Sequence, residues 1–197
     1  MIDQDHQKWW PMIDRDHQKK FVEVWDKGEY RRGSTAQRLV QRLMGWIPES
    51  ASINDYGCGT GRAEVEIHKL RPTQKITMID ITQTAVEDEA KIYPFIEADL
   101  CDLSEAPEAD WGMCINVLMT VQADKLDLIL FNIKNTCKNL IVEVYDWQDV
   151  RLDREYTTII MTKEQWGDKL KEYWPVVEYE QDHGNARRFI YICRGDL

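Results

Sequence analysis

The sequence predicts an α/β protein built around a mostly parallel β-sheet, and three observations support this. After residue 50, short apolar or β-branched runs alternate with longer amphipathic runs, which is the pattern of βαβ units. A glycine-rich segment stands where the first strand would turn into the first helix. Near the C-terminus, two apolar runs flank the turn-forming residues 182–185 (DHGN), which predicts an antiparallel hairpin. We therefore expect a seven-stranded, mostly parallel sheet with an antiparallel C-terminal strand.

The individual elements follow from local patterns. The expected parallel strands are 52–56, 75–79, 94–98, 111–116 and 140–144, the expected hairpin strands are 176–179 and 189–193, and the expected helices are 63–70, 84–91 and 123–136. In the last of these helices, Leu126, Ile129 and Leu130 recur at a spacing that places them on one face. Thr162 and Gln165 have the spacing of a capping box and predict the start of a further helix.

Composition excludes several classes of protein. The chain has 197 residues and a formal net charge of -10, which disfavours binding to duplex DNA, because such affinity depends on many Lys and Arg contacts to phosphate. No run approaches the roughly 20 apolar residues of a membrane-spanning helix, and the first residues are not those of a secretory signal. The five cysteines are odd in number and include no CxxC pair. We expect a cytoplasmic protein with reduced thiols, no metal site and no membrane contact.

The N-terminal quarter differs from the rest of the chain. Residues 1–50 carry a net charge of about +1 against about -11 for residues 51–197, and four of the eight tryptophans lie before residue 50. The segment 1–8 (MIDQDHQK) recurs once, at 12–19 (MIDRDHQK). His6 and His17 within these segments would lie roughly 16 Å apart on a helix, too far for one metal ion. We predict a helical extension or lid at 1–50 and a cofactor-binding domain at 51–197.

The segment that carries chemistry is the glycine turn. Gly57, Gly59 and Gly61 allow a sharp turn and close approach of a ligand, and the helix N-terminus behind them favours a negatively charged group. Nineteen residues later, Asp80 ends the second strand, where an acid can accept hydrogen bonds from both hydroxyls of a ribose. A nicotinamide dinucleotide site requires a third glycine where this chain has Arg62. An oxidoreductase therefore remains a minor alternative.

The turn reads DYGCGTG from Asp55 and resembles motif I of the class I S-adenosylmethionine-dependent methyltransferases. The chain also looks like the small, largely uncharacterised members of that family that phages often encode. The resemblance runs from about residue 36 to the C-terminus and implies a Rossmann-like methyltransferase fold with S-adenosylmethionine as cofactor. It implies the following cofactor-binding residues: Asp55, Gly57, Cys58, Gly59, Asp80, Ile81, Asp99, Leu100 and Asn116.

One further cofactor contact is expected from the N-terminal segment. Arg31 lies in the run Tyr30 to Arg32, and a guanidinium group matches the geometry of the cofactor's carboxylate. The alternative is that this run is a basic surface patch. For the acceptor, Tyr145 and Trp147 would border the place where substrates enter this fold, although Trp147 could equally be a core residue.

The sequence gives less information about catalysis. The family resemblance places Asn116 beside the methyl donor, and we expect Asn116 and Asp146 as the catalytic residues, with Glu143 as another possible base. Relatives often continue this motif with an acid or methionine followed by histidine, but this chain has Met119 and Thr120. Methyl transfer depends mainly on positioning, so amine or thiol acceptors would need the least help from a base. Loss of transfer activity, leaving only cofactor binding, is the alternative.

The acceptor itself is not identified by the sequence. The fourth strand lacks the [DNS]PP[YFW] and Pro-Cys segments of enzymes that methylate DNA bases, so a DNA base is not expected. A small molecule is the first expectation, and RNA or a protein could approach the Arg-bearing N-terminal segment despite the overall acidity.

Overall fold

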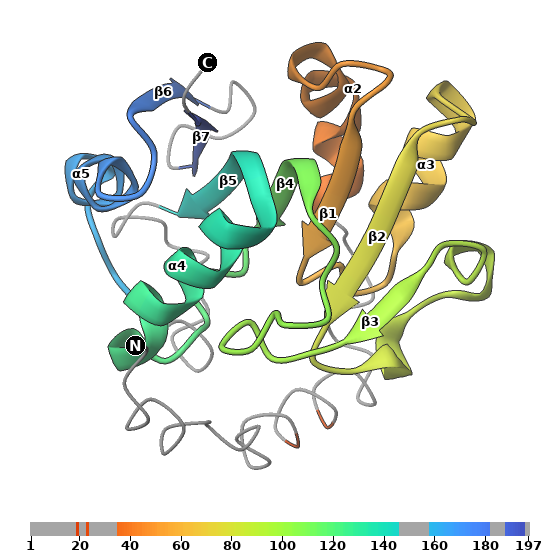
Figure 1. Cartoon of the computed structure of the whole chain (residues 1–197), viewed down its shortest axis with the longest axis horizontal. Helices are drawn as coiled ribbons and strands as arrows, with labels where there is room; N and C mark the ends of the chain where they lie inside the picture. Colours follow the sequence, from red (N-terminus) through yellow and green to blue (C-terminus); the bar gives the residue numbers. More distant parts are fainter. Residues whose placement is uncertain (1–18, 20–22, 24–34, 146–157, 182–187, 196–197) are drawn as a thin grey trace, which may run out of the picture.

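A seven-stranded β-sheet forms the centre of the protein in the computed structural model, which describes residues 19, 23, 35–145, 158–181 and 188–195 (Figure 1). The strands are β1 (Ser52–Tyr56), β2 (Lys75–Asp80), β3 (Phe95–Glu97), β4 (Ala109–Ile115), β5 (Cys137–Tyr145), β6 (Val176–Gln181) and β7 (Arg188–Arg194). The α-helices of the described ranges with side chains in the core are α2 (Thr35–Trp46), α3 (Arg62–Leu70), α4 (Leu126–Thr136) and α5 (Lys163–Lys171). Three short 3₁₀ turns are η3 (Gln83–Ala85), η4 (Asp88–Ala90) and η5 (Ala123–Lys125).

The strand order is β3-β2-β1-β4-β5-β7-β6, and it confirms the predicted fold class. The pairs among β1 to β5 are parallel, whereas β7 is antiparallel to both β5 and β6. The direction in which successive strands are added reverses between β1 and β4. In open parallel sheets, ligands bind beyond the carboxyl ends of the strands at such a switch point. The topology therefore predicts a ligand site beyond the carboxyl ends of β1, β2 and β4.

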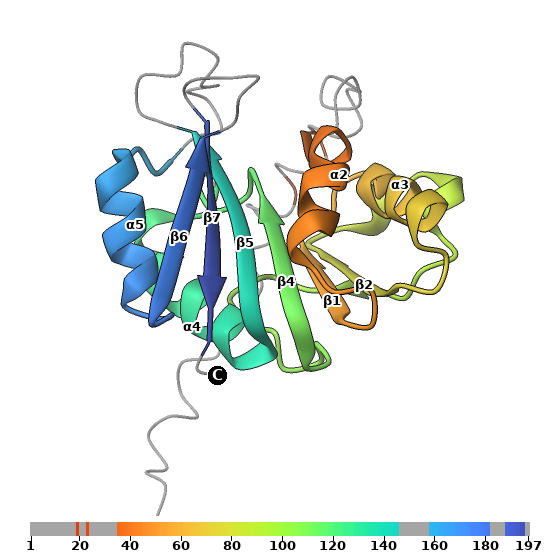
Figure 2. The ribbon, with the colours of Figure 1, turned by 90° about the horizontal axis from the view of Figure 1, so that it is seen from above.

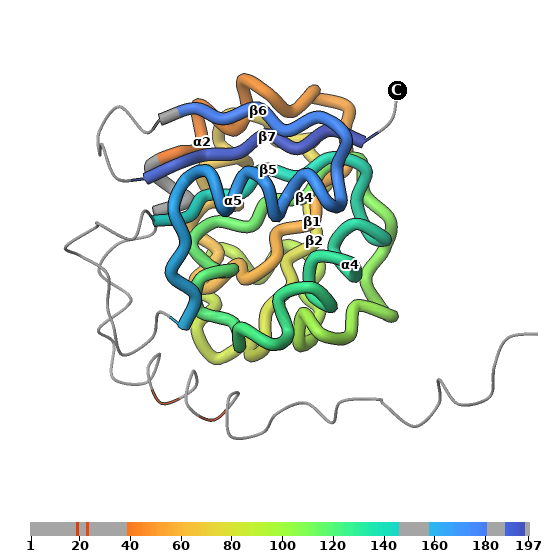
Figure 3. Tube along the Cα trace, turned by 90° about the vertical axis from the view of Figure 1, so that its left-hand side faces the viewer, coloured from red at the N-terminus to blue at the C-terminus, as the bar shows by residue number. Residues whose placement is uncertain are grey.

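Helices cover both faces of the sheet because successive strand residues point to opposite sides. Helices α4 and α5 pack against one face, in a cluster that includes Leu130, Trp166 and Val142. Helices α2 and α3 pack against the other face, where Leu43 and Ile67 meet neighbouring strand residues. Figure 2 shows the strands β6, β7, β5 and β4 side by side, and Figure 3 shows α5 at the β6 end of the sheet.

Helix α2 belongs to the same core as the sheet. Leu39, Leu43 and Ile47 are at most 1% exposed, and they share a cluster with Ile53 of β1 and Ile141 of β5. At roughly 1.5–3 kcal/mol for each fully buried aliphatic side chain, this helix stabilises the sheet substantially. The proposed role of residues 1–50 as a lid stays a prediction, because most of that segment lies outside the described residues.

The predicted helix at 84–91 is wrong, because this segment forms the turns η3 and η4 instead. The Thr82 side chain accepts a hydrogen bond from the amide of Thr84, which stabilises a turn. The amide of Glu87 donates to the carbonyl of Thr60 at 3.0 Å and is therefore not available for a helical bond. The predicted helix at 123–136 begins as η5 and becomes α-helical at Leu126.

Two other local predictions are confirmed. The amide of Gln165 donates to the Thr162 hydroxyl and the amide of Thr162 donates to Oε1 of Gln165, which completes the capping box of α5. Strands β6 and β7 pair as an antiparallel hairpin, and the DHGN segment between them lies outside the described residues. In the part of the chain that is described, no helix has the length and apolar character needed to cross a bilayer.

Candidate cofactor and acceptor site

The glycine turn between β1 and α3 has a backbone that only glycine adopts easily. Gly57, Gly59 and Gly61 have φ angles of 77°, 57° and 74°, all in the left-handed region. A Cβ atom on Gly57 would lie 2.3 Å from Cγ2 of Val117, and one on Gly61 would lie 2.4 Å from Cβ of Ala90. The turn therefore needs glycine for conformation and for space.

Hydrogen bonds join this turn to the end of β2. The amides of Gly57 and Cys58 both donate to the carbonyl of Ile79, at 2.7 and 3.3 Å. The amide of Gly59 donates to Oδ2 of Asp80 at 2.8 Å. The acid predicted at the end of the second strand thus lies against the glycine turn.

Asp80 is an acid in an environment that disfavours its charge. Its exposure is only 8%, and burial raises its pKa to about 6, although the backbone amides of Gly59, Thr82 and Ile81 favour the carboxylate. Ile81, which follows it, is half-buried. At neutral pH, a largely ionised carboxylate with low solvation is available at this turn.

Asp55 forms a buried carboxyl pair with a residue that the sequence analysis missed. Asp55 is the residue before the end of β1, and Glu64 lies in the first turn of α3; they are 2% and 0% exposed. Burial is the main cause that raises the pKa of both carboxyls, and for Asp55 the charge of Glu64 raises it further. One sequence signal was available, since Glu64 shares the buried helix face of Ile67, three residues later.

The segment after β3 is fixed by side-chain bonds to its backbone. Oδ1 of Asp99 accepts the amide of Cys101 at 2.9 Å, while Asn132 of α4 donates to the carbonyls of Leu100 and Cys101. Leu100 is 8% exposed and packs in the core, whereas Asp99 is half-buried. The Cys101 thiol has its pKa raised to about 12, mainly by burial, and is therefore not a thiolate at neutral pH.

Asn116 follows β4 in a conformation that is unusual for a residue with a side chain. Its φ angle is 61°, a region where asparagine is tolerated better than most residues. Its amide donates to the carbonyl of Glu143 at 3.0 Å, and its Oδ1 is buried without a hydrogen-bond partner among the described residues. Because Val117 contacts Gly57, the end of β4 adjoins the glycine turn.

Glu143 of β5, whose carbonyl accepts the Asn116 amide, has a charged neighbour on β7. Glu143 of β5 is fully buried, and its Oε2 lies 3.9 Å from Nη1 of Arg188 on β7. The Arg188 guanidinium lies 4.3 Å from the ring centroid of Tyr145, which is a cation–π distance. These groups give the end of β5 a polar character.

Met119 and Thr120, which stand where relatives often have an acid or methionine followed by histidine, make hydrogen bonds that hold the backbone after β4. Met119 is 2% exposed, and its carbonyl accepts the amides of Thr158 and Ile159. The Thr120 hydroxyl donates to the carbonyl of Val117 at 2.8 Å. Neither side chain is a base. The predicted residues Arg31, Asp146 and Trp147 lie outside the described residues, as do His6 and His17.

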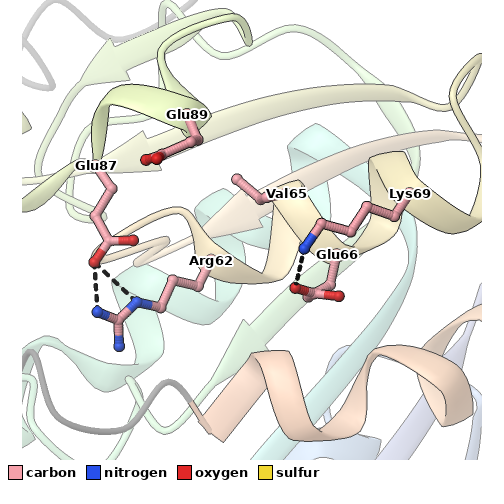
Figure 4. Close-up of a pocket in the computed structure, with 6 residues that line it drawn as sticks. All are labelled: Arg62, Val65, Glu66, Lys69, Glu87 and Glu89. Carbon is pink, nitrogen blue, oxygen red and sulfur yellow. Dashed lines mark hydrogen bonds and ion pairs between the residues drawn. The ribbon is translucent and has the colours of Figure 1, made fainter.

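A surface depression lies between α3 and the segment around η4, and neither Asp55 nor Glu64 is among its lining residues (Figure 4). Its volume is about 380 Å³, and it is lined by Arg62, Val65, Glu66, Lys69, Glu87 and Glu89. Four of its charged side chains are paired, Arg62 with Glu87 and Lys69 with Glu66, both at 2.6 Å. Within the described ranges, no group of three or more His, Cys, Asp or Glu side chains could hold a metal ion.

Several solved structures with a similar fold are named as methyltransferases. An O-methyltransferase family protein from Burkholderia thailandensis matches with a TM-score of 0.64 and 14% identity, over 93% of this chain and 61% of that chain. The 1,6-didemethyltoxoflavin-N1-methyltransferase of the same organism, solved with S-adenosylhomocysteine, matches with a TM-score of 0.71 and 13% identity, over 91% and 87%. Human N-acetylserotonin methyltransferase, solved with SAM, matches with a TM-score of 0.62 and 22% identity, over 91% and 55%.

The fold is that of the class I methyltransferases. The similarity lies in the architecture, because the identities are between 13% and 22%. The chain spans about six-tenths of the length of the first of these proteins. No protein-family model matches the sequence, and a comparison with curated proteins gives no match. The resemblance to phage-encoded members stays a prediction.

Proposed function

We propose that this chain binds S-adenosylmethionine at the glycine turn and transfers its methyl group to an acceptor held beyond the ends of β4 and β5. The observation that carries the proposal is the bond from the Gly59 amide to Asp80, within a turn whose three glycines all have positive φ. It combines a backbone that a ligand can approach closely with an acid suited to ribose hydroxyls. Both features lie at the switch point of a methyltransferase fold.

The residues present fit this cofactor. Gly57, Cys58 and Gly59 would contact its aminoacyl part, and Asp80 and Ile81 would contact its ribose. Asp99 and Leu100 would meet the adenine edge, and Asp55 would favour the ammonium group electrostatically. Arg31 would pair with the cofactor carboxylate. When bound, the cofactor supplies an electrophilic methyl group on a sulfonium.

The chain's own part in transfer is mainly to position the acceptor. The buried Oδ1 of Asn116 has no described partner and could accept a hydrogen bond from an N–H or O–H of the acceptor. A proton would pass to Glu143 or Asp146 where the acceptor needs to lose one. An acceptor that is already nucleophilic needs no such base, so a small-molecule amine or thiol is the first choice, with RNA or a protein as further candidates.

Calorimetric titration with S-adenosylhomocysteine tests the cofactor assignment. We expect binding by the unaltered protein and at least about tenfold weaker binding by Asp80→Asn, since a charge-assisted hydrogen bond contributes about 1.5–3 kcal/mol. Asp168→Asn, on the exposed side of α5, is the matched control and should bind like the unaltered protein. Absence of binding at millimolar ligand would refute the proposal.

A second experiment separates transfer from binding alone. The protein is incubated with S-adenosylmethionine labelled in its methyl group and with amines, thiols, phenols and RNA in turn, and the labelled products are separated. Transfer to one class supports the enzyme. Tight cofactor binding without transfer to any class would instead favour a cofactor-binding protein that lacks the activity.

A further inference from the structure

The carboxyl pair of Asp55 and Glu64, next to the glycine turn, would carry two close negative charges if both groups were ionised. Asp55 and Glu64 approach each other between β1 and α3, and both are almost completely buried. Both side-chain oxygens of Glu64 are buried, and the groups within hydrogen-bonding reach of them are the Asp55 carboxyl and the backbone amide of Glu64 itself. Two adjacent carboxylates in a poorly solvated site repel strongly, so the stable arrangement keeps one proton between them.

The other ionisable groups around the pair do not offset a second negative charge. Asp80 of β2 is a further carboxylate: its charge raises the pKa of Glu64, and the charge of Asp55 raises the pKa of Asp80. The Cys58 thiol of the turn has its pKa raised by burial and then by Asp80, Glu64 and Asp55, so it stays neutral. Tyr93, after η4, donates its hydroxyl to the backbone carbonyl of Glu64 and not to its carboxylate.

The charged groups of α3 itself are used elsewhere. Arg62 pairs with Glu87 at 2.6 Å, and Lys69 pairs with Glu66 at 2.6 Å on the outer side of the helix (Figure 4). The charges that act on Asp55 and on Glu64 are those of carboxylates. The described protein thus supplies no cation to this pair.

We propose that Asp55 and Glu64 hold a single shared proton, and that the pair releases this proton to solvent when a ligand carrying an ammonium group binds at the glycine turn. The inference rests on the proposed function, because the aminoacyl end of S-adenosylmethionine carries such an ammonium. The charges balance: one positive charge arrives with the ligand, one proton leaves, and the pair becomes doubly negative.

Glu64 is a positioning residue in this scheme, since it acts through Asp55 and adjoins the turn from below. Without Glu64, Asp55 loses the neighbouring negative charge that raises its pKa beyond the effect of burial, so it holds a proton less tightly and has less to release. With Glu64 replaced by glutamine, a hydrogen bond from the amide to Asp55 preserves the packing and removes the shared proton. Proton release therefore distinguishes this role from a purely structural one.

The test is calorimetric titration of the full chain with S-adenosylhomocysteine at about pH 7, in phosphate and in Tris. These buffers differ in ionisation enthalpy, so the difference in heat gives the number of protons released. We expect about 0.5 to 1 proton per ligand for the unaltered protein and clearly fewer for Glu64→Gln, in which burial alone raises the Asp55 pKa. Glu66→Gln, a half-buried residue of the same helix that pairs with Lys69, should release as many protons as the unaltered protein.

A second ligand isolates the ammonium. Methylthioadenosine keeps the ribose that Asp80 would contact but lacks the aminoacyl group, so it should bind without proton release by the pair. Equal proton release with both ligands would overturn the inference and assign the proton to Asp80. S-adenosylhomocysteine binding with the same heat in both buffers would overturn the inference and leave the proposed function intact, whereas absence of binding would overturn both.

The unaltered protein also provides a check that does not depend on the variant folding. Its infrared spectrum at about pH 7 should contain the carbonyl stretch of a buried protonated carboxyl, and this band should disappear when S-adenosylhomocysteine is added. A spectrum without that band before ligand addition would refute the shared proton.

Discussion

Replacing Asp80 by asparagine should change how the stability of the ligand-free protein depends on pH. Burial raises the Asp80 pKa from 3.8 to about 6, so the folded state binds its proton more tightly than the unfolded state. A group of this kind contributes stability at low pH, and that contribution is lost as the pH rises through the folded pKa. Asparagine does not titrate, so the variant lacks this loss.

The size of the effect follows from the two pKa values. A shift of about two units corresponds to about 3 kcal/mol when the loss is complete, at 1.36 kcal/mol per unit. Between about pH 4.5 and 7.5, the free energy of unfolding of Asp80→Asn should therefore rise by about 2 kcal/mol relative to that of the unaltered protein. Asparagine also lacks one of the two carboxylate oxygens that accept backbone amides. This loss changes the free energy of unfolding by an amount that does not depend on pH, so the trend is unaltered.

Urea denaturation at several pH values, without cofactor, measures the difference. The Asp55–Glu64 pair titrates in both proteins, and loss of the Asp80 charge alters the Glu64 pKa less than burial does, so the pair changes the comparison less than Asp80 itself. Asp168→Asn, whose side chain is exposed on α5, should follow the pH dependence of the unaltered protein. If the difference between Asp80→Asn and the unaltered protein is independent of pH, Asp80 is not the destabilised acid inferred from its burial.

Three further substitutions test other parts of the structure. Leu43→Ala should lower the free energy of unfolding by about 2–5 kcal/mol in urea denaturation, because the side chain is 0% exposed between α2 and the sheet. A decrease below about 1 kcal/mol would show that α2 is not part of the core. Gly57→Ala should abolish S-adenosylhomocysteine binding in a calorimetric titration, since the added Cβ would meet Val117. Combining it with Val117→Ala should restore part of the binding. Normal binding by Gly57→Ala alone would contradict the geometry of the turn. Thr162→Ala should lower the stability by about 1 kcal/mol in thermal denaturation, because the Gln165 amide loses its capping acceptor. Thr158→Ala is a comparison outside the helix cap. An unchanged melting temperature for Thr162→Ala would argue against the capping box.

The fold was largely predictable because its signals are local. The alternation of strands and helices and the turn signals before β7 predict the sheet, and the capping box predicts α5. The segment 84–91 was mispredicted because its decisive contact is not local. The bond from the Glu87 amide to the Thr60 carbonyl joins residues 27 apart in the sequence, and no helical periodicity reveals it.

The candidate site was predictable where a motif fixes the backbone. Gly57, Gly59 and Gly61 were recognised from their spacing, and Asp80 from its place after β2. Glu64 was not, because a glutamate in the first turn of an amphipathic helix is ordinarily a solvent-facing residue that suits the helix dipole. Only its packing against β1 reveals that it faces another acid.

The distribution of stabilised and destabilised acids supports a ligand site at the glycine turn. Some acids elsewhere in the described structure are stabilised as carboxylates by their partners: hydrogen bonds from Ser52 lower the pKa of Asp110, and a bond from Lys169 lowers that of Asp127. At the turn, the dominant effect on Asp55, Glu64 and Asp80 is burial, which raises the pKa and opposes folding at neutral pH. Proteins tolerate such local conflicts mainly where function requires them. A bound cation with ribose hydroxyls would stabilise the same carboxylates that destabilise the ligand-free fold, so the turn should be stabilised by its ligand more than any other part of the described sheet.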